Sequence, residues 1–241
     1  MKIFPSLFNQ FVNLLIPPRC VKCSSILENK EGLCTSCWPL ISFIAKPYCA
    51  CCGRPFDFDI EESALCGSCS YDSPHYKSAR SVFIYTAESR DLILKFKHTD
   101  SIHSAPLFAT WMTRALDDLE NPLCIPVPLH WSRLFMRTYN QAALLAHEIA
   151  KVKGWAYYPT LLKRQRRTPS QGYLSKKERI QNVRRAFNVP QTKKELLQGK
   201  KILLVDDVFT TGATLNACSK ALLKAGAYEV HAVTLGRVVT P

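Results

Sequence analysis

The sequence predicts an α/β protein, a parallel β-sheet flanked by helices, with a small cysteine-rich module in front of it. From residue 76 onward, short apolar runs alternate with amphipathic helical patterns, as is typical of parallel strands joined by helices. Before residue 76 this alternation is missing, and nine of the 11 cysteines lie there. We therefore expect two domains, a helix plus cysteine module at 1–75 and an α/β domain at 76–241.

Each element is expected from a local pattern. Strands are predicted where β-rich or continuous apolar runs are bounded by turn residues, at 81–86, 123–128, 157–162, 201–205 and 230–235. Helices are predicted at 88–98, 105–119, 141–153 and 213–225, and the last of these ends at Gly226, a residue common after helices. Ligands of parallel sheets bind at the carboxyl ends of the strands, so the residues after 205 are the first candidates for a site.

The charge balance favours polyanionic partners. The 241 residues include 32 Lys and Arg against 19 Asp and Glu, which gives a formal net charge of +13. Nucleic acid, phosphorylated metabolites and anionic membrane all fit such a charge, and general solubility is the simplest alternative. The apolar fraction of 47% is ordinary for a globular protein.

The first 16 residues are apolar at helical spacing. A secretory signal is not expected, because only one lysine precedes the apolar residues, polar residues interrupt them, and no small-residue cleavage site follows. The stretch is also too short and too polar to span a bilayer. We expect a helix that covers the cysteine module, with docking to a membrane surface or a partner as the alternative. The expected location is the cytoplasm, with peripheral contact at the inner face of the membrane as a variant.

Eight cysteines form four C-x-x-C pairs, a spacing that directs two thiolates toward one tetrahedral ion. These candidate metal ligands are Cys20, Cys23, Cys34, Cys37, Cys49, Cys52, Cys66 and Cys69. They can hold one or two structural zinc ions, and either sequential or crossed pairing of the C-x-x-C turns is open. Cys51 could replace Cys49, while Cys124 and Cys218 are expected in the core. A disulfide framework would require an oxidising compartment and is disfavoured.

Residues 201–214, KILLVDDVFTTGAT, combine groups that suit a ribose 5-phosphate. Gly212 permits close backbone approach, and N–H groups at a helix start suit a phosphate. Carboxylates accept hydrogen bonds from sugar hydroxyls or hold a cation. The residues expected to bind are Asp206, Asp207, Thr210, Thr211, Gly212, Ala213 and Thr214.

This stretch resembles the PRPP-binding motif of type I phosphoribosyltransferases, in which magnesium-bound phosphoribosyl pyrophosphate (PRPP) loses pyrophosphate to a nucleophile. The resemblance implies PRPP as ligand, Mg²⁺ as cofactor, and a catalytic role for Asp206 and Asp207. Purine-salvage members carry a carboxylate where this chain has Thr210, so purine salvage is disfavoured.

Further segments resemble the ComF/GntX family, which joins a zinc module to a phosphoribosyltransferase-like domain and is tied to natural competence and the use of external DNA. They are PVPLH at 126–130, RTYNQ at 137–141, TPSQ at 168–171, the cysteine pairs, Lys97 in LILKFKH, and Arg237 after the last strand. The resemblance implies that Lys97, Arg133 and Arg137 lie on the pyrophosphate side. Thr138 stands where the family often has glycine, and Phe135 and Met136 stand where basic residues are common, so we expect a weaker anion grip or fewer DNA contacts there.

A basic segment at 163–187 carries nine positive charges against one negative charge. Such a segment can neutralise phosphates, and Tyr173 can stack on an unpaired base. The residues expected to bind nucleic acid are Lys163, Arg164, Arg166, Arg167 and Arg179. A solvated loop and a flap over PRPP are the alternatives.

Three functions are consistent with these patterns. The first is handling of single-stranded DNA during natural transformation, together with membrane-associated uptake machinery. The second is an active phosphoribosyltransferase with an unknown acceptor, and the third is a PRPP-gated regulator without turnover. Pyrophosphate release separates the second from the third.

Overall fold

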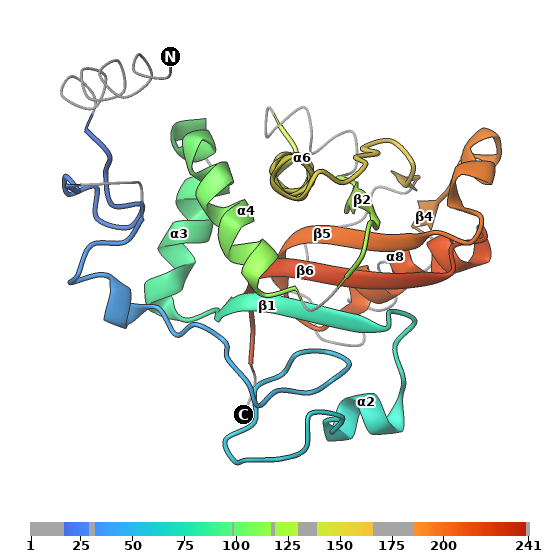
Figure 1. Cartoon of the computed structure of the whole chain (residues 1–241), viewed down its shortest axis with the longest axis horizontal. Coiled ribbons are helices and arrows are strands. Elements are labelled where there is room, and N and C mark those ends of the chain that lie inside the picture. Colours follow the sequence, from blue (N-terminus) through green and yellow to red (C-terminus); the bar gives the residue numbers. More distant parts are fainter. Residues whose placement is uncertain are drawn as a thin grey trace, which may run out of the picture.

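The protein is built around a four-stranded parallel sheet (Figure 1). The computed structural model describes residues 17–28, 32–97, 99–116, 119–129, 139–165 and 186–239. The strand order is β1-β6-β5-β2, so the two strands that come last in the chain lie in the middle of the sheet. The strands are β1 (Ser78–Ile84), β2 (Leu123–Pro126), β5 (Lys201–Phe209) and β6 (Glu229–Arg237). This arrangement confirms the predicted fold class.

Helices cover both faces of the sheet because side chains on a strand alternate between its faces. Leu203 and Val205 pack on one side with α3 (Ala87–Lys97), α4 (Ala105–Arg114) and α6 (Gln141–Lys153). Ile202 and Leu204 pack on the other side against α8 (Ala213–Lys224). Figure 1 shows the first three helices together on one side of the sheet and α8 on the opposite side. We call these sides the α3 face and the α8 face.

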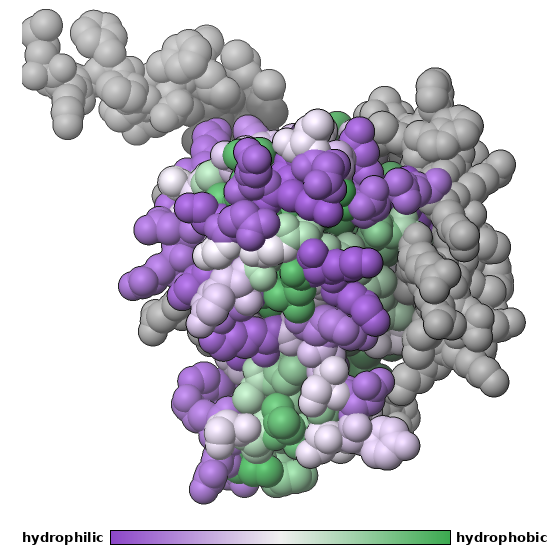
Figure 2. Space-filling view, turned by 90° about the vertical axis from the view of Figure 1, so that its right-hand side faces the viewer, coloured by the Kyte–Doolittle hydropathy of each residue, from purple (hydrophilic) through white to green (hydrophobic). Residues whose placement is uncertain are grey.

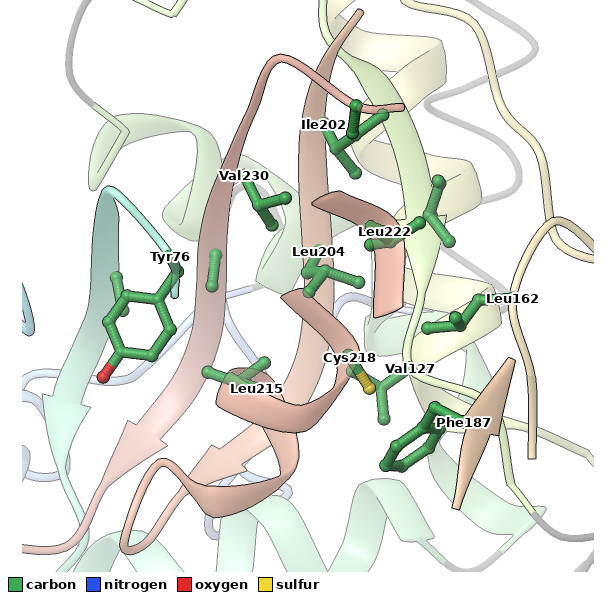
Figure 3. Close-up of a cluster of buried hydrophobic side chains, with 14 of the residues drawn as sticks. Tyr76, Val127, Leu162, Phe187, Ile202, Leu204, Leu215, Cys218, Leu222 and Val230 are labelled. Atoms are coloured by element: carbon green, nitrogen blue, oxygen red, sulfur yellow. The ribbon is translucent and has the colours of Figure 1, made fainter. Parts of the chain in front are cut away.

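The core of the α8 face extends to both sides of the helix (Figure 3). Tyr76 lies beside Leu215 in the first turn of α8, and Phe187 lies on the far side of Cys218. Phe187 belongs to a small antiparallel pair formed by β3 (Lys163–Arg164) and β4 (Phe187–Asn188). Cys124 and Cys218 are fully buried, as predicted for core residues.

The remaining described elements are short. They are α2 (Gly67–Tyr71) and the 3-10 turns Trp38–Leu40, Thr99–Ser104, Gln191–Lys193 and Glu195–Leu197. The N-terminal segment at 1–16, predicted to be helical, lies outside the described residues.

The predicted strands at 81–86, 123–128 and 230–235 are observed with bounds shifted by up to three residues, and the helix predicted at 105–119 ends at Arg114. Two other predicted strands differ more. The prediction ended one strand at Val205, but β5 continues to Phe209 because its pairing with β6 continues to the Phe209–Arg237 register. The strand predicted at 157–162 is wrong, since only Tyr157 makes a bridge, to Cys124, before the chain turns. Leu161 and Leu162 are buried there without strand pairing, so their hydrophobicity reflects the core of the α8 face.

The two cysteine clusters attach to opposite faces of the sheet. Near the first cluster, Val21 and Leu33 pack against the core of the α3 face, and Lys95 of α3 donates to the carbonyl of Lys22. The second cluster is part of the core of the α8 face. Among the described segments, no helix is long and apolar enough to cross a membrane.

Apolar side chains are exposed on the second cysteine module. Phe58, Leu65 and Tyr71 are all exposed there. Figure 2 shows hydrophobic residues among hydrophilic ones on the lower part of one face, where Figure 1 places this module.

Candidate functional site

The paired aspartates lie inside β5 and continue its alternation between the two faces. Leu204 faces α8, so Asp206, two residues further, lies on the same side, while Asp207 lies on the α3 face. The backbone N–H of Asp207 donates to Asp206 Oδ1 at 2.9 Å. Because β2 ends opposite Val205, the aspartates lie beyond the end of that neighbouring strand. The two carboxylates therefore flank the carboxyl edge of the sheet from opposite sides.

Asp207 forms an ion pair with Lys97, the last residue of α3. The Nζ atom lies 2.8 Å from Asp207 Oδ2, and both side chains are about one-fifth exposed. The predicted pyrophosphate-side lysine is thus brought to the same edge as the aspartates. A partly exposed ion pair of this kind can open, so Asp207 can exchange its lysine partner for another donor.

Asp206 lies in a less favourable environment for a charge. Burial, and next the negative charge of Asp207, raise the pKa of Asp206 to about 8. The neighbouring N–H, Lys97 and Arg164 oppose this rise in the pKa. A carboxyl held in this way gains from any ligand that donates hydrogen bonds to it.

The loop after β5 is shaped by Gly212, the residue before α8. Its φ of 75° lies in the left-handed region, and a Cβ there would come within 2.8 Å of Phe209 Cζ and 3.2 Å of the Tyr76 hydroxyl. Both the backbone conformation and the available space therefore require glycine. Thr211 Oγ1 accepts from the N–H of Ala213 at 3.4 Å, which orders the turn into the helix.

Residues 210–214 present an anion-binding type of surface. Thr210, Thr211, Ala213 and Thr214 are partly exposed, and α8 begins at Ala213. The first N–H groups of a helix have no intrahelical acceptors and point outward with the positive end of the helix dipole. Together with the carboxylates of Asp206 and Asp207, the loop offers donors for a phosphate beside acceptors for hydroxyls.

The eight predicted metal ligands form two clusters. In each cluster the four sulfur atoms lie within 4.8 Å of one another. The sulfurs of Cys23 and Cys34 lie 3.6 Å apart, as do those of Cys52 and Cys66, too far for a disulfide bond. Tetrahedral zinc with Zn–S bonds of about 2.3 Å separates its sulfurs by about 3.8 Å, so both clusters fit a structural zinc ion.

The clusters settle the pairing that the sequence left open. Cys20 and Cys23 join Cys34 and Cys37, so pairing is sequential. The second cluster uses Cys49, and Cys51 stands outside it with its thiol 3.9 Å from the carbonyl of Tyr76. The hydrogen bond from the Cys52 side chain, aided by backbone N–H groups, lowers the pKa of Cys49 to about 4, and the same contact raises the pKa of Cys52.

The predicted basic residues are only partly covered by the structure. Lys163 is exposed on β3, whereas the guanidinium of the next residue, Arg164, lies 5.4 Å from the ring centre of Phe187 and is close enough to Asp206 to influence its pKa. Arg164 thus lies toward the aspartates rather than in open solvent. Arg133, Arg137, Arg166, Arg167 and Arg179 lie outside the described residues.

The sequence indicates Arg237 only through the family resemblance and assigns no role to it or to Tyr76, although both support the loop. Arg237, at the end of β6, is buried against Phe209, and Tyr76 packs edge-on against the same ring. A charged residue that ends an otherwise apolar strand was the available signal for Arg237.

Two domain families match this chain. The double zinc ribbon domain matches residues 11–70, and the phosphoribosyl transferase domain matches residues 159–238. These matches agree with the two cysteine clusters and with the parallel sheet that ends in the Asp206–Thr214 loop.

Relatives match over almost the whole chain. Competence protein F of Haemophilus influenzae is 33% identical over 230 residues, which are 91% of this chain and 96% of that protein. DNA utilization protein YhgH of Salmonella typhimurium is 30% identical, covering 94% of this chain and 100% of that protein. Competence protein ComFC of Streptococcus pneumoniae is 27% identical, covering 88% and 91%.

Solved structures are more distant. The glutamine PRPP amidotransferase from B. subtilis complexed with ADP and GMP is 22% identical with a TM-score of 0.40. The match covers 59% of this chain and 30% of that one.

Proposed function

Because the chain belongs to the ComF/GntX family, we propose that it handles single-stranded DNA during DNA uptake and binds PRPP at the loop between β5 and α8. We expect it to work in the cytoplasm, with peripheral contact at the inner face of the membrane, where uptake machinery would deliver the incoming strand, as a variant. The observation that carries the PRPP half is the placement of Asp206 and Asp207 beside the Gly212 loop at the carboxyl edge of the sheet.

The two parts of a ribose 5-phosphate match the two parts of this edge. The 5-phosphate accepts hydrogen bonds from the N–H groups and threonine hydroxyls of residues 210–214. The ribose hydroxyls donate to Asp206 and Asp207. Hydrogen bonds to the buried Asp206 carboxylate stabilise its charged form and so offset the burial that raises its pKa. Binding of hydroxyls at Asp207 frees the Lys97 ammonium, 2.8 Å away, to meet the pyrophosphate.

Magnesium fits this edge because carboxylate oxygens are its preferred protein ligands and it usually binds together with substrate phosphates. When bound with PRPP, it neutralises charge on the pyrophosphate. The chain itself supplies Lys97, Arg133 and Arg137 to the same group. Whether pyrophosphate then leaves decides between an enzyme and a PRPP-gated regulator.

The DNA half rests on charge and on the relatives named for competence and DNA utilization. Arg166, Arg167 and Arg179 are the cations of the basic segment that we expect at the DNA backbone, with Lys163 at its exposed end. Arg164 connects this segment to Asp206, so an occupied DNA site and an occupied PRPP site would affect each other.

The first test is pyrophosphate release from Mg-PRPP, with and without single-stranded DNA. We compare wild type with Asp207→Ala and with Asp91→Ala, an exposed carboxylate on the helix that carries Lys97. Release that depends on Asp207, and not on Asp91, would make the protein an enzyme. Binding of PRPP without release would make it a regulator, and absence of PRPP binding at millimolar concentration would refute the site.

The second test measures affinity for single-stranded DNA against salt concentration. Replacing Arg166, Arg167 and Arg179 together by Gln should flatten the log–log salt slope by about 2, at ~0.7 per lost phosphate contact. The matched control replaces three exposed lysines, Lys200, Lys220 and Lys224, and changes the net charge equally. Equal slopes for both triple variants would refute a DNA site in the basic segment.

A further inference from the structure

Arg237 is a buried cation for which the described residues provide no carboxylate partner. The residue, at the end of β6, is only 6% exposed, and none of the ion pairs among described residues includes it. Nη1 donates to the carbonyl of Cys52 at 2.6 Å, and Nη2 donates to Cys52 Sγ at 3.3 Å. A buried guanidinium is costly unless a negative charge lies next to it.

The second cysteine cluster supplies that charge when it holds its metal. Four thiolates around one Zn²⁺ leave a net charge of −2, and Arg237 contacts one of the four sulfurs. Hydrogen bonds from neighbouring groups to metal ligands commonly tune metal affinity. In the described part of the chain no hydrogen bond joins a cation to a sulfur of the first cluster, and the exposed Arg19 and Lys95 donate to backbone carbonyls.

The same guanidinium lies against the support of the phosphate loop. Its central carbon is 4.1 Å from the ring centre of Phe209, the last residue of β5. Phe209 and Tyr76 pack edge to face with ring centres 6.4 Å apart, and both rings close the space under Gly212. The carbonyl of Phe209 also accepts from the N–H of Val238, next to Arg237. A continuous series of contacts thus joins Cys52, Arg237, Phe209 and Gly212.

We propose that the metal-loaded second cluster holds the phosphate loop in its binding geometry through Arg237 and Phe209, whereas the first cluster does not. Arg237 is a positioning residue in this arrangement. The ligand part rests on the proposed function, that residues 210–214 bind a ribose 5-phosphate. Because coupling between two sites is reciprocal, a ligand on the loop should also tighten retention of the second metal ion.

A ligand-free experiment tests the coupling first. We compare amide hydrogen exchange of residues 209–216, and metal release to a chelator, in wild type, Arg237→Gln, Arg237→Lys and Lys95→Met. Cadmium-113 NMR of the cadmium-substituted protein resolves the two clusters. Arg237→Gln should release one of the two ions roughly 10- to 100-fold faster, the usual range for such partners, and should speed exchange in the loop.

The other variants make the result interpretable. Arg237→Lys keeps the charge and protects folding, but it cannot reach both Cys52 atoms and the Phe209 ring, so it should show a smaller change of the same kind. Lys95→Met removes a cation that bonds to the first module and should leave loop exchange unchanged. If Arg237→Gln and Arg237→Lys both exchange in the loop at the wild-type rate, the inference is wrong.

A second arm adds ribose 5-phosphate. In wild type it should slow metal release from the second cluster and not from the first, and Arg237→Gln should abolish this selectivity. If ribose 5-phosphate binds wild type but slows both clusters equally, the coupling is refuted. If it does not bind wild type at all, the proposed function fails, while loop exchange in the first arm still decides the inference.

Discussion

The two cysteine clusters share a ligand spacing but differ in how the protein holds them. In the first, Cys23 is exposed and Cys34 is half-buried, and the module lies over α3. In the second, all four cysteines are buried and share a core with Tyr76 and the sheet. The same local metal motif therefore serves as a surface element in one place and as part of the domain core in the other.

Backbone contacts explain the difference. The N–H of Ala79 on β1 donates to the carbonyl of Cys51 at 2.7 Å, and a Cβ on Gly53 would come within 2.5 Å of the Ala79 carbonyl oxygen. The second module thus packs with its backbone directly on β1, which only glycine permits at position 53. Loss of the second cluster should therefore destabilise the whole α/β domain, whereas loss of the first cluster should destabilise only the first module.

The largest expected effect is on stability, when one cysteine of each cluster is replaced. Cys52→Ser removes a metal ligand and leaves Arg237 buried beside a neutral group, which should cost roughly 3–5 kcal/mol. Cys23→Ser, at an exposed ligand, should release one zinc ion and cost much less. Denaturant unfolding with zinc analysis measures both. Equal losses of stability would contradict the distinction between the clusters.

The second effect concerns the loop that the second module supports. Gly212→Ala should cost about 2–3 kcal/mol, because an L residue is strained at positive φ and the new Cβ would meet Phe209 at 2.8 Å. Gly154→Ala is the matched control, since its φ of 70° is similar but its Cβ would meet nothing, and about 1 kcal/mol is expected. Thermal unfolding of both variants separates strain from crowding. A similar cost for both would argue against close packing under the loop.

The third prediction concerns Asp206, whose position on the α8 face should lower the stability of the fold. A carboxyl whose pKa is raised by folding stabilises the fold most below its unfolded pKa, and this contribution is lost as the pH rises to about 8. Asp206→Asn should therefore gain roughly 1–2 kcal/mol at pH 7, after discounting for partial exposure, and almost nothing near pH 4.

The neighbouring aspartate provides the control. Asp207→Asn breaks the ion pair with Lys97 on the α3 face and should lower stability at pH 7. Urea unfolding across pH 4–8 distinguishes the two variants. A loss for Asp206→Asn at every pH would contradict the assigned environment.

The smallest expected effect concerns an exposed ion pair on the second module. Lys46 and Glu62 form a 2.7 Å ion pair on the second module, with side chains 55% and 79% exposed. Glu62→Gln should change stability by less than about 0.5 kcal/mol, because water screens exposed pairs. A clearly larger loss in thermal unfolding would mean that surface charge, rather than the buried contacts of Cys51 and Arg237, fixes this module.

Much of the fold could be predicted because its signals are local. The C-x-x-C pairs predicted both clusters of four cysteines, since each turn brings two thiols together regardless of the rest of the chain. Helix α6 was predicted at its observed bounds, 141–153, where Asn140 caps the start and Gly154 ends it in the left-handed conformation. The aspartates and Gly212 were placed at the correct sheet edge by the apolar run before them.

Other features depend on contacts that a pattern does not contain. The apolar run appeared to end at Val205, so the separation of Asp206 and Asp207 onto opposite faces emerged only from pairing with β6 as far as Phe209. The role of Arg237 depends on Cys52, which is 185 residues away in the chain. The failed strand at 157–162 shows that a buried apolar stretch can belong to an irregular segment.

The strand order also has a consequence for synthesis on the ribosome. Among the described strands, β1 pairs with β6 and β2 pairs with β5, so neither early strand has its neighbouring strand until residues 201–237 have been made. Before that, the described β-bridges of the two strands to the rest of the chain are single ones, Phe43 with Phe83 and Tyr157 with Cys124. The cysteine modules can capture metal while the chain is still growing, but the sides of β1 and β2 that pair with β6 and β5 must wait. A polypeptide that ends before residue 201 could therefore form its cysteine modules but would lack β5 and β6, the two central strands of the sheet. Such a truncated chain should be prone to aggregation.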